Sequence, residues 1–157
     1  MAPRIAVFLA LVVAVAAACG EDKKPAVEVS VHDLRPGDCF DGTARQPEDP
    51  GDEERPALVV GSVPCSQSHD KEVFAVFEHP AKPDSLYPGE KEVAKVAQDG
   101  CADRVAAYVG RSFEESDLLV AVIAPGPAFW DGDDDRTIVC TLQGNKPLKG
   151  SQKADAG

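Results

Sequence analysis

The alternation of hydrophobic and polar positions predicts a chain with several strands. Val27, Val29 and Val31 alternate with polar neighbours, which is the pattern of a strand with one buried face. Further strands are expected at residues 58–65, 71–79, 117–124 and 136–142. After Asp117 the run at 117–124 is continuously apolar, so we expect it to be a central strand.

One long helix is predicted from Glu90 to Val109. Its apolar residues recur at steps of three and four and form one stripe, made of Val93, Ala97, Cys101, Val105 and Tyr108. Pro88 precedes the helix, and Gly110 directly follows it, which suits a C-terminal cap. Gly100 weakens the middle of the helix without interrupting the stripe.

The polar segments predict the connections. Residues 41–57 contain three prolines and six carboxylates, which predicts an exposed loop. Residues 66–70 join two strands, 125–135 form a loop or one helical turn, and 143–157 form a disordered tail. The sum is an α+β fold, a small antiparallel or mixed β-sheet with one main helix packed on a face.

The N-terminal segment of the chain has the organisation of a secretory signal peptide. Arg4 precedes an apolar run over residues 5–18, which is shorter than the roughly 20 residues of a membrane-spanning helix. Three alanines then lead to Cys19, as in the bacterial lipobox, although Ala16 stands where leucine is usual. We therefore expect a signal peptide at 1–18 and a lipid anchor and tether at 19–28. The alternative is an ordinary signal peptide that leaves an unmodified thiol.

Composition and charge restrict the classes of partner that we expect for this chain. The formal net charge is −11, and loss of residues 1–18 would leave 15 basic and 27 acidic residues, a charge of −12. Nucleic-acid binding needs a clustered basic surface, so we expect no nucleic-acid partner. Contact with the membrane is expected only through a lipid on Cys19, on the outer face of the cell membrane.

The other four cysteines are expected to form two disulfides in an oxidising compartment. Four cysteines allow three pairings, and sequence alone does not choose among them. We favour Cys39–Cys65 and Cys101–Cys140, because Cys101 lies on the buried stripe of the helix and Cys140 lies in a buried strand. Each bridge would stabilise the fold by roughly 3–4 kcal/mol.

Metal chemistry is weakly supported, and no cofactor is expected. Asp131, Asp133 and Asp135 alternate like the start of an EF-hand loop, but Arg136 stands where glycine is needed and Leu142 where glutamate is needed. We expect a solvated acidic turn. The cysteines and the three histidines, at positions 32, 69 and 79, lack the short spacing of zinc sites.

The segment "SQSHD" contains the residue types of a hydrolytic triad. Triad members converge from separated segments, so their adjacency in Ser66, Ser68, His69 and Asp70 favours a hydrogen-bonded turn instead. Trp130, the only tryptophan, is more typical of a core than of a ligand platform.

Four blocks of the sequence resemble the septum formation family of small extracytoplasmic domains. They are "VHDLRPGDCFD", "VPCSQSHDKEVFAVFEHP", "YPGEKEVAKVAQDGCADRVAAYVG" and "FWDGDDDRTIVCTL", within residues 29–142. The resemblance implies structural cysteines, makes His69, Asp70 and Trp130 part of a shared pattern and possible binding residues, and suggests a role near cell division. It implies no catalytic residue.

Three functions follow as hypotheses. The favoured one is a non-catalytic, lipid-anchored envelope protein that binds a division or envelope protein, or a cell-wall component. The second is an extracytoplasmic lipoprotein that binds or senses a small ligand, with a pocket near residues 66–70 and Trp130. The third is a cell-wall hydrolase that uses His69 and Asp70.

Overall fold

The computed structural model describes residues 24–47, 58–133 and 135–154, which form an antiparallel sheet of six strands, one long helix and three short helical segments. The predicted signal peptide, Cys19 and residues 20–23 of the tether lie outside the described residues. The strand order is β1-β3-β2-β4-β6-β5. The elements are β1 Val27–Ser30, η1 Val31–Asp33, β2 Cys39–Arg45, β3 Val59–Val63, β4 Ser68–Glu78, α1 Glu90–Val109, η2 Phe113–Glu115, β5 Leu118–Ile123, α2 Pro127–Asp133 and β6 Thr137–Lys149.

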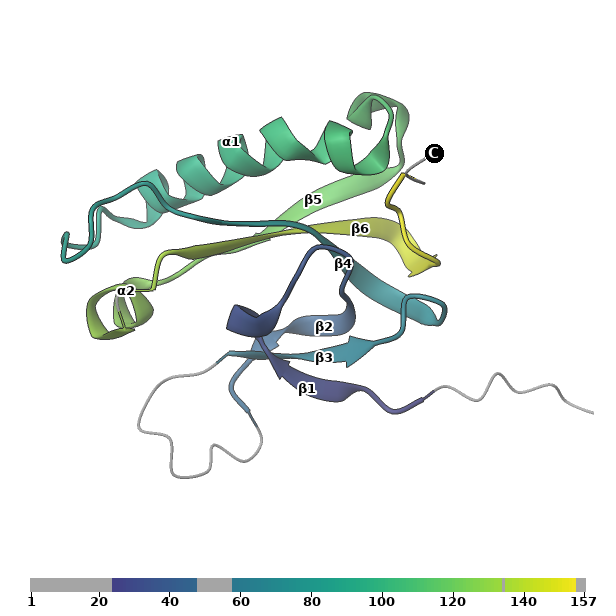
Figure 1. Cartoon of the computed structure of the whole chain (residues 1–157), viewed down its shortest axis with the longest axis horizontal. Coiled ribbons are helices and arrows are strands. Elements are labelled where there is room, and N and C mark those ends of the chain that lie inside the picture. Colours follow the sequence, from purple (N-terminus) through teal and green to yellow (C-terminus); the bar gives the residue numbers. More distant parts are fainter. Residues whose placement is uncertain (1–23, 48–57, 134, 155–157) are drawn as a thin grey trace, which may run out of the picture.

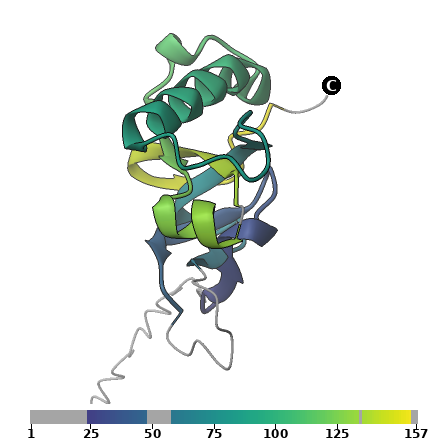
Figure 2. The same ribbon diagram turned by 90° about the vertical axis from the view of Figure 1, so that its left-hand side faces the viewer.

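The elements are arranged in three layers (Figures 1 and 2). Helix α1 lies on one side of β4, β6 and β5, and β1, β3 and β2 lie on the other side. Strands β2 and β4 pair only at Cys39↔Glu72 and Phe40↔Lys71, so the sheet bends at this junction. The predicted α+β class, with an antiparallel sheet and one main helix on a face, is confirmed.

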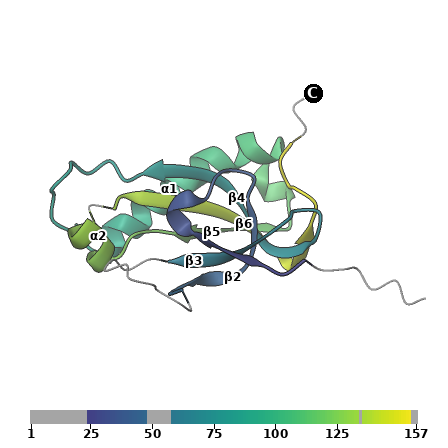
Figure 3. The same cartoon turned by 60° about the horizontal axis from the view of Figure 1, so that its bottom comes forward.

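Two hydrophobic clusters fill the spaces between the layers. The first lies between α1 and the sheet and includes Phe74, Val105 and Ile138. The second lies between β4 and β6 on one side and β2 and β3 on the other, where η1 contributes Val31 and the nearby Leu34 is fully buried. Figure 3 shows η1 and these strands.

Helix α1 has the predicted bounds and the predicted buried stripe. Gly110 caps its C-terminus in the left-handed conformation (φ 69°), and its N–H donates to the carbonyl of Ala106. The structure also explains Gly100, because a Cβ there would lie 2.4 Å from the Phe77 ring. Arg104 stacks on the same ring, with its Cζ 4.4 Å from the ring centre. No helix among the described residues is long and apolar enough to cross a membrane.

Two predicted connections are in fact strand. Residues 41–45, expected in an exposed loop, complete β2, which pairs with β3 through a register shift. Gly42 adopts a φ of 78° at this irregularity, which suits glycine. Residues 68–70 of the expected joining turn begin β4. The rest of the predicted acidic loop, 48–57, lies outside the described residues.

The predicted disordered tail is wrong for residues 143–154. Strand β6 continues to Lys149 and pairs with both β4 and β5, for example at His69↔Leu148 and Leu118↔Gly144. Beyond the strand, the N–H of Ala154 donates to the carbonyl of Tyr108 (2.9 Å). Residues 150–154 are therefore held against the end of α1.

The position predicted for strand 117–124 is also wrong. β5 lies at the edge of the sheet, beside β6 alone among the described strands. Its apolar composition reflects α1, which covers one of its faces, rather than a central place in the sheet.

Candidate functional site

His69 and Asp70 are adjacent in β4 and have separate structural roles. His69 is 1% exposed, and its Nδ1 donates to the carbonyl of Gln67 (2.8 Å). Asp70 is exposed, and its Oδ2 accepts from the N–H of Gly42 (2.8 Å) while its own N–H donates to Asp41 Oδ1 (3.1 Å). Asp70 thus joins β4 to β2. The two side chains do not form a histidine–carboxylate pair.

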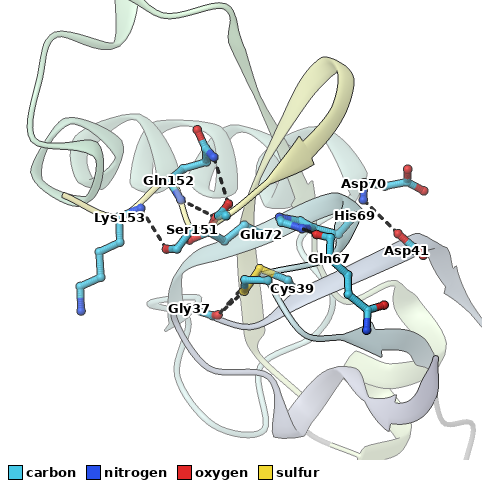
Figure 4. The surroundings of a disulfide bond; sticks show 12 residues. Gly37, Cys39, Asp41, Gln67, His69, Asp70, Glu72, Ser151, Gln152 and Lys153 are labelled. Atoms are coloured by element: carbon cyan, nitrogen blue, oxygen red, sulfur yellow. Dashed lines mark hydrogen bonds between the residues drawn. A yellow bond between two sulfur atoms is a disulfide. The ribbon is translucent and has the colours of Figure 1, made fainter. Parts of the chain in front are cut away.

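A buried carboxylate that the sequence analysis missed lies three residues after His69. Glu72 is 0% exposed. Its Oε1 accepts from the hydroxyls of Tyr108 (2.7 Å) and Ser151 (2.6 Å), and its Oε2 accepts from the N–H of Gln152 (2.7 Å). Figure 4 shows Glu72 beside Ser151 and Gln152 of the C-terminal segment. The carboxylate therefore ties β4, α1 and the C-terminal segment together.

The environment of Tyr108 follows from this contact. Burial of the phenol, then its hydrogen bond to Glu72 and the charge of that carboxylate, raise the pKa of Tyr108 well above its usual value. Tyr108 therefore remains a neutral donor to Glu72. The sequence carries no signal that sets Glu72 apart, because it directly follows Asp70 and Lys71 and reads as part of a charged run.

The two disulfides join the predicted cysteines. The Cα atoms are 5.2 Å apart in Cys39–Cys65 and 5.6 Å apart in Cys101–Cys140, within the usual range. Cys101 projects from α1 to β6, as the stripe indicated. Cys65 lies in the turn between β3 and β4, where its carbonyl accepts from the N–H of Gly150 (2.8 Å).

The residues around the first disulfide do not fit a metal site. Donor atoms of Cys39, His69 and Glu72 lie within 4.8 Å of one another. The sulfur of Cys39 is bonded to Cys65, however, and metals bind the free thiolate. The Glu72 oxygens already accept three hydrogen bonds. His69 Nε2 is buried without a hydrogen-bond partner among the described residues.

Trp130 is 1% exposed and lies among aromatic and charged side chains, outside the two hydrophobic clusters described above. Arg136 stacks on the indole, with Cζ 3.7 Å from the ring centre, and the indole N–H donates to the Ser85 carbonyl (2.7 Å). The rings of His79 and Tyr87 meet Trp130 edge-on. Burial lowers the pKa of His79, Glu92 opposes this shift and Arg136 adds to it. Trp130 thus holds the 79–89 connector to the start of β6 as a core residue.

The acidic run after Trp130 is not an EF-hand loop. Asp131 and Asp133 lie within helix α2, where a calcium loop would need irregular backbone. Asp135 follows the helix, and its Oδ1 accepts from the N–H of Thr137 (2.8 Å). Its Oδ2 lies 3.7 Å from Nε2 of His32.

Hollows in the described surface lie along β5. Neither His69 nor Trp130 lines them, although Tyr87, whose ring meets Trp130 edge-on, lines one of them. Two adjoining cavities of about 630 and 760 Å³ lie between α1 and β5 and share Gln98 and Val122. We call them together the α1–β5 groove. Its lining is largely apolar and includes Ala94, Ala97, Ala102, Val105, Ala106, Phe113, Val120 and Val122. A third cavity of about 380 Å³, the β2–β5 groove, lies on the other face of β5 and includes Phe40, Ala44 and Ile123.

These features define a small α+β domain, held by two disulfides, with apolar grooves on both faces of an edge strand. The chain belongs to the septum formation family, whose sequence profile matches residues 21–156. Membership confirms the resemblance seen in the cysteine-containing blocks and links the chain to septum formation and cell division. No curated protein and no solved structure matches the chain.

Proposed function

We propose that this chain is a non-catalytic, lipid-anchored module of the cell envelope that binds another protein during septum formation. The observation that carries the proposal is the α1–β5 groove. Its apolar lining beside an edge strand suits a protein segment, because exposed apolar patches mark interaction sites. Membership of the septum formation family supports a division protein as the partner.

The non-catalytic part of the proposal is supported by the contacts of the candidate residues. His69 is buried against Gln67, and Asp70 bonds to β2. Purified protein should leave peptidoglycan intact, with divalent metals supplied. Release of soluble muropeptides by wild type but not by His69→Ala would overturn this part.

The lipid anchor rests on the sequence around Cys19. Two acyl chains anchor a protein stably where one chain does not. Cells labelled with a fatty-acid analogue should incorporate it into wild type and not into Cys19→Ser. Equal labelling of both would contradict the anchor and leave the binding proposal standing.

The partner is tested by cross-linking the tagged protein in dividing cells and identifying the products by mass spectrometry. We expect division or cell-wall synthesis proteins, recovered less with Cys19→Ser because the module loses its membrane position. The alternative is a small-ligand lipoprotein, since each cavity of the groove has the size of a ligand site. Failure to recover a division protein, together with a bound small molecule in native mass spectra, would favour that alternative.

A further inference from the structure

The outer edge of β5 carries backbone groups that point away from the sheet. Thr141 Oγ1 donates to the carbonyl of Ala121 (3.2 Å), so this carbonyl points toward β6. On the opposite side of β6, Thr141 is paired with Val73 of β4. The N–H of Val73 donates to the carbonyl of Asp38, and its carbonyl accepts from the N–H of Gly37, so these groups point away from Thr141. The backbone groups of Thr141 are therefore directed at β5, and Ala121 and Thr141 form a hydrogen-bonded pair.

Hydrogen-bonded pairs alternate along an antiparallel ladder. Val120 and Val122, which flank Ala121, consequently direct their N–H and C=O groups outward. Among the described residues no strand lies beyond them. Leu119 on this strand is 49% exposed, so the edge is also apolar. Exposed apolar edges of this kind are templates for pairing with another chain.

The two grooves lie where an added strand would place its side chains. Successive side chains of a strand point to opposite faces of the sheet. Beside β5, one set would enter the α1–β5 groove and the other set would enter the β2–β5 groove. Open space on both faces therefore fits an added strand whose consecutive residues are apolar and point alternately into the two grooves.

Charge indicates which chain would bind there. The charged residues that line the α1–β5 groove are Glu90 and Glu114, one at each end, and both are exposed. The charged residue in the lining of the β2–β5 groove is Lys71, whose ammonium donates to the carbonyl of Gly42 (2.7 Å). The chain as a whole has a formal net charge of −11. In an antiparallel pair of two β5 strands, the Glu114 end of each copy would meet the Glu90 end of the other. A second copy is therefore disfavoured, and a segment with basic ends is favoured.

We propose that β5 binds an extended segment of a partner protein, which adds to the sheet edge as a further strand. The segment is apolar in its middle and carries Lys or Arg at both ends. This inference rests on the proposed function and names the surface and the partner chemistry. Backbone hydrogen bonds to Val120 and Val122 would supply affinity, and the two grooves would supply specificity.

The test selects phage-displayed random nine-residue peptides for binding to the protein, which is purified from its host in its processed form. We expect apolar peptides with basic ends. They should bind Val120→Pro more than about tenfold more weakly than wild type, because proline removes the outward N–H of residue 120 and spares the β6 ladder. Val120→Ala, which keeps that N–H and shortens only the groove contact, should lose much less affinity than Val120→Pro. If Val120→Pro does not fold, Val122→Pro replaces it in the same binding measurement.

A charge-neutral variant of the groove tests the preference for basic ends. Glu90→Gln combined with Glu114→Gln should weaken these peptides by about threefold or more, as expected for exposed ion pairs. Asp103→Asn, on an exposed position of α1 outside the groove lining, is the matched control and should leave affinity unchanged. Selection of acidic peptides, or equal binding by Val120→Pro and wild type, would overturn the proposal.

Hydrogen exchange tests the geometry without a variant. A saturating selected peptide should slow exchange of the Val120 and Val122 amides by about tenfold or more. Slow exchange already in the free protein would show that a segment of the same chain occupies the edge. A dimer that Val120→Pro abolishes would assign the edge to a second copy. In-cell recovery of division proteins that is unaffected by Val120→Pro would reject this surface while leaving the proposed function intact.

Discussion

Replacing Tyr108 with phenylalanine removes one of three donors to the buried Glu72 carboxylate and leaves the ring in place. The hydroxyl lies 2.7 Å from Glu72 Oε1, and the carboxylate has no exposure to water that could replace it. A hydrogen bond to a charged group contributes about 1.5–3 kcal/mol. We therefore expect Tyr108→Phe to lower the free energy of unfolding by about 2 kcal/mol. For a domain of this size the melting temperature should fall by about 6–10 °C.

Urea denaturation with intact disulfides measures this loss. Trp130, the only tryptophan, is buried and reports unfolding through its fluorescence. The matched control is Tyr87→Phe, because the Tyr87 hydroxyl makes no hydrogen bond among the described residues. We expect the control to change the free energy of unfolding by less than about 0.5 kcal/mol.

Equal effects of Tyr108→Phe and Tyr87→Phe on the free energy of unfolding would refute the role of the Tyr108 hydroxyl. A double-mutant cycle gives a second criterion, because the hydroxyls of Tyr108 and Ser151 donate to the same oxygen of Glu72. Tyr108→Phe and Ser151→Ala should be coupled by at least about 0.5 kcal/mol. Strict additivity would mean that the shared carboxylate does not connect the helix to the C-terminal segment.

Three further predictions concern the pKa of Tyr108, the C-terminal segment and the Cys101–Cys140 disulfide. The pKa of Tyr108 is raised in the folded state, so its contribution is complete below about pH 10 and is lost as the pH rises further. Above that pH, wild type should lose stability more steeply than Tyr108→Phe in urea titrations. Removing residues 150–157 deletes two donors to Glu72 and should lower the free energy of unfolding by about 3 kcal/mol or more. Cys101→Ala with Cys140→Ala opens a loop of 39 residues and should cost about 4 kcal/mol in thermal unfolding.

Each of these has a contradicting outcome. If the free energies of unfolding of wild type and Tyr108→Phe fell in parallel above pH 10, ionisation of Tyr108 would not contribute to the alkaline loss of stability. Removal of residues 155–157 alone deletes none of the donors, so an equal loss in that control would contradict the role of Ser151 and Gln152. Unchanged stability of the double cysteine variant would mean that packing of α1 on β6 suffices without the covalent link.

The helix and the favoured Cys101–Cys140 bridge could be predicted because the signal for them is local and periodic. The stripe on α1 recurs from Val93 to Tyr108, and it places Cys101 on the buried face beside a buried strand. The strand order could not be predicted, because it depends on which neighbours are present. The apolar sequence of β5 fits a central strand and also fits an edge strand under α1.

The C-terminal strand and the buried carboxylate were hidden by their polar composition. Residues 143–149 contain glycine, lysine and proline, yet cross-strand partners such as His69 and Leu118 hold them in the sheet. Glu72 reads as a surface charge until α1 and the C-terminal segment supply its donors. Long-range pairing of this kind leaves no periodic trace in either segment.

The measurement that tests the central claim most directly is site-specific photo-cross-linking in dividing cells. A photoreactive residue at position 119 lies on the exposed edge of β5, and one at position 27 lies on the exposed edge of β1, where Val27 is 64% exposed. We expect a cross-link from position 119 to a division protein, through a segment with basic ends, and none from position 27. Cross-links of equal yield from both positions, or none from position 119, would contradict it.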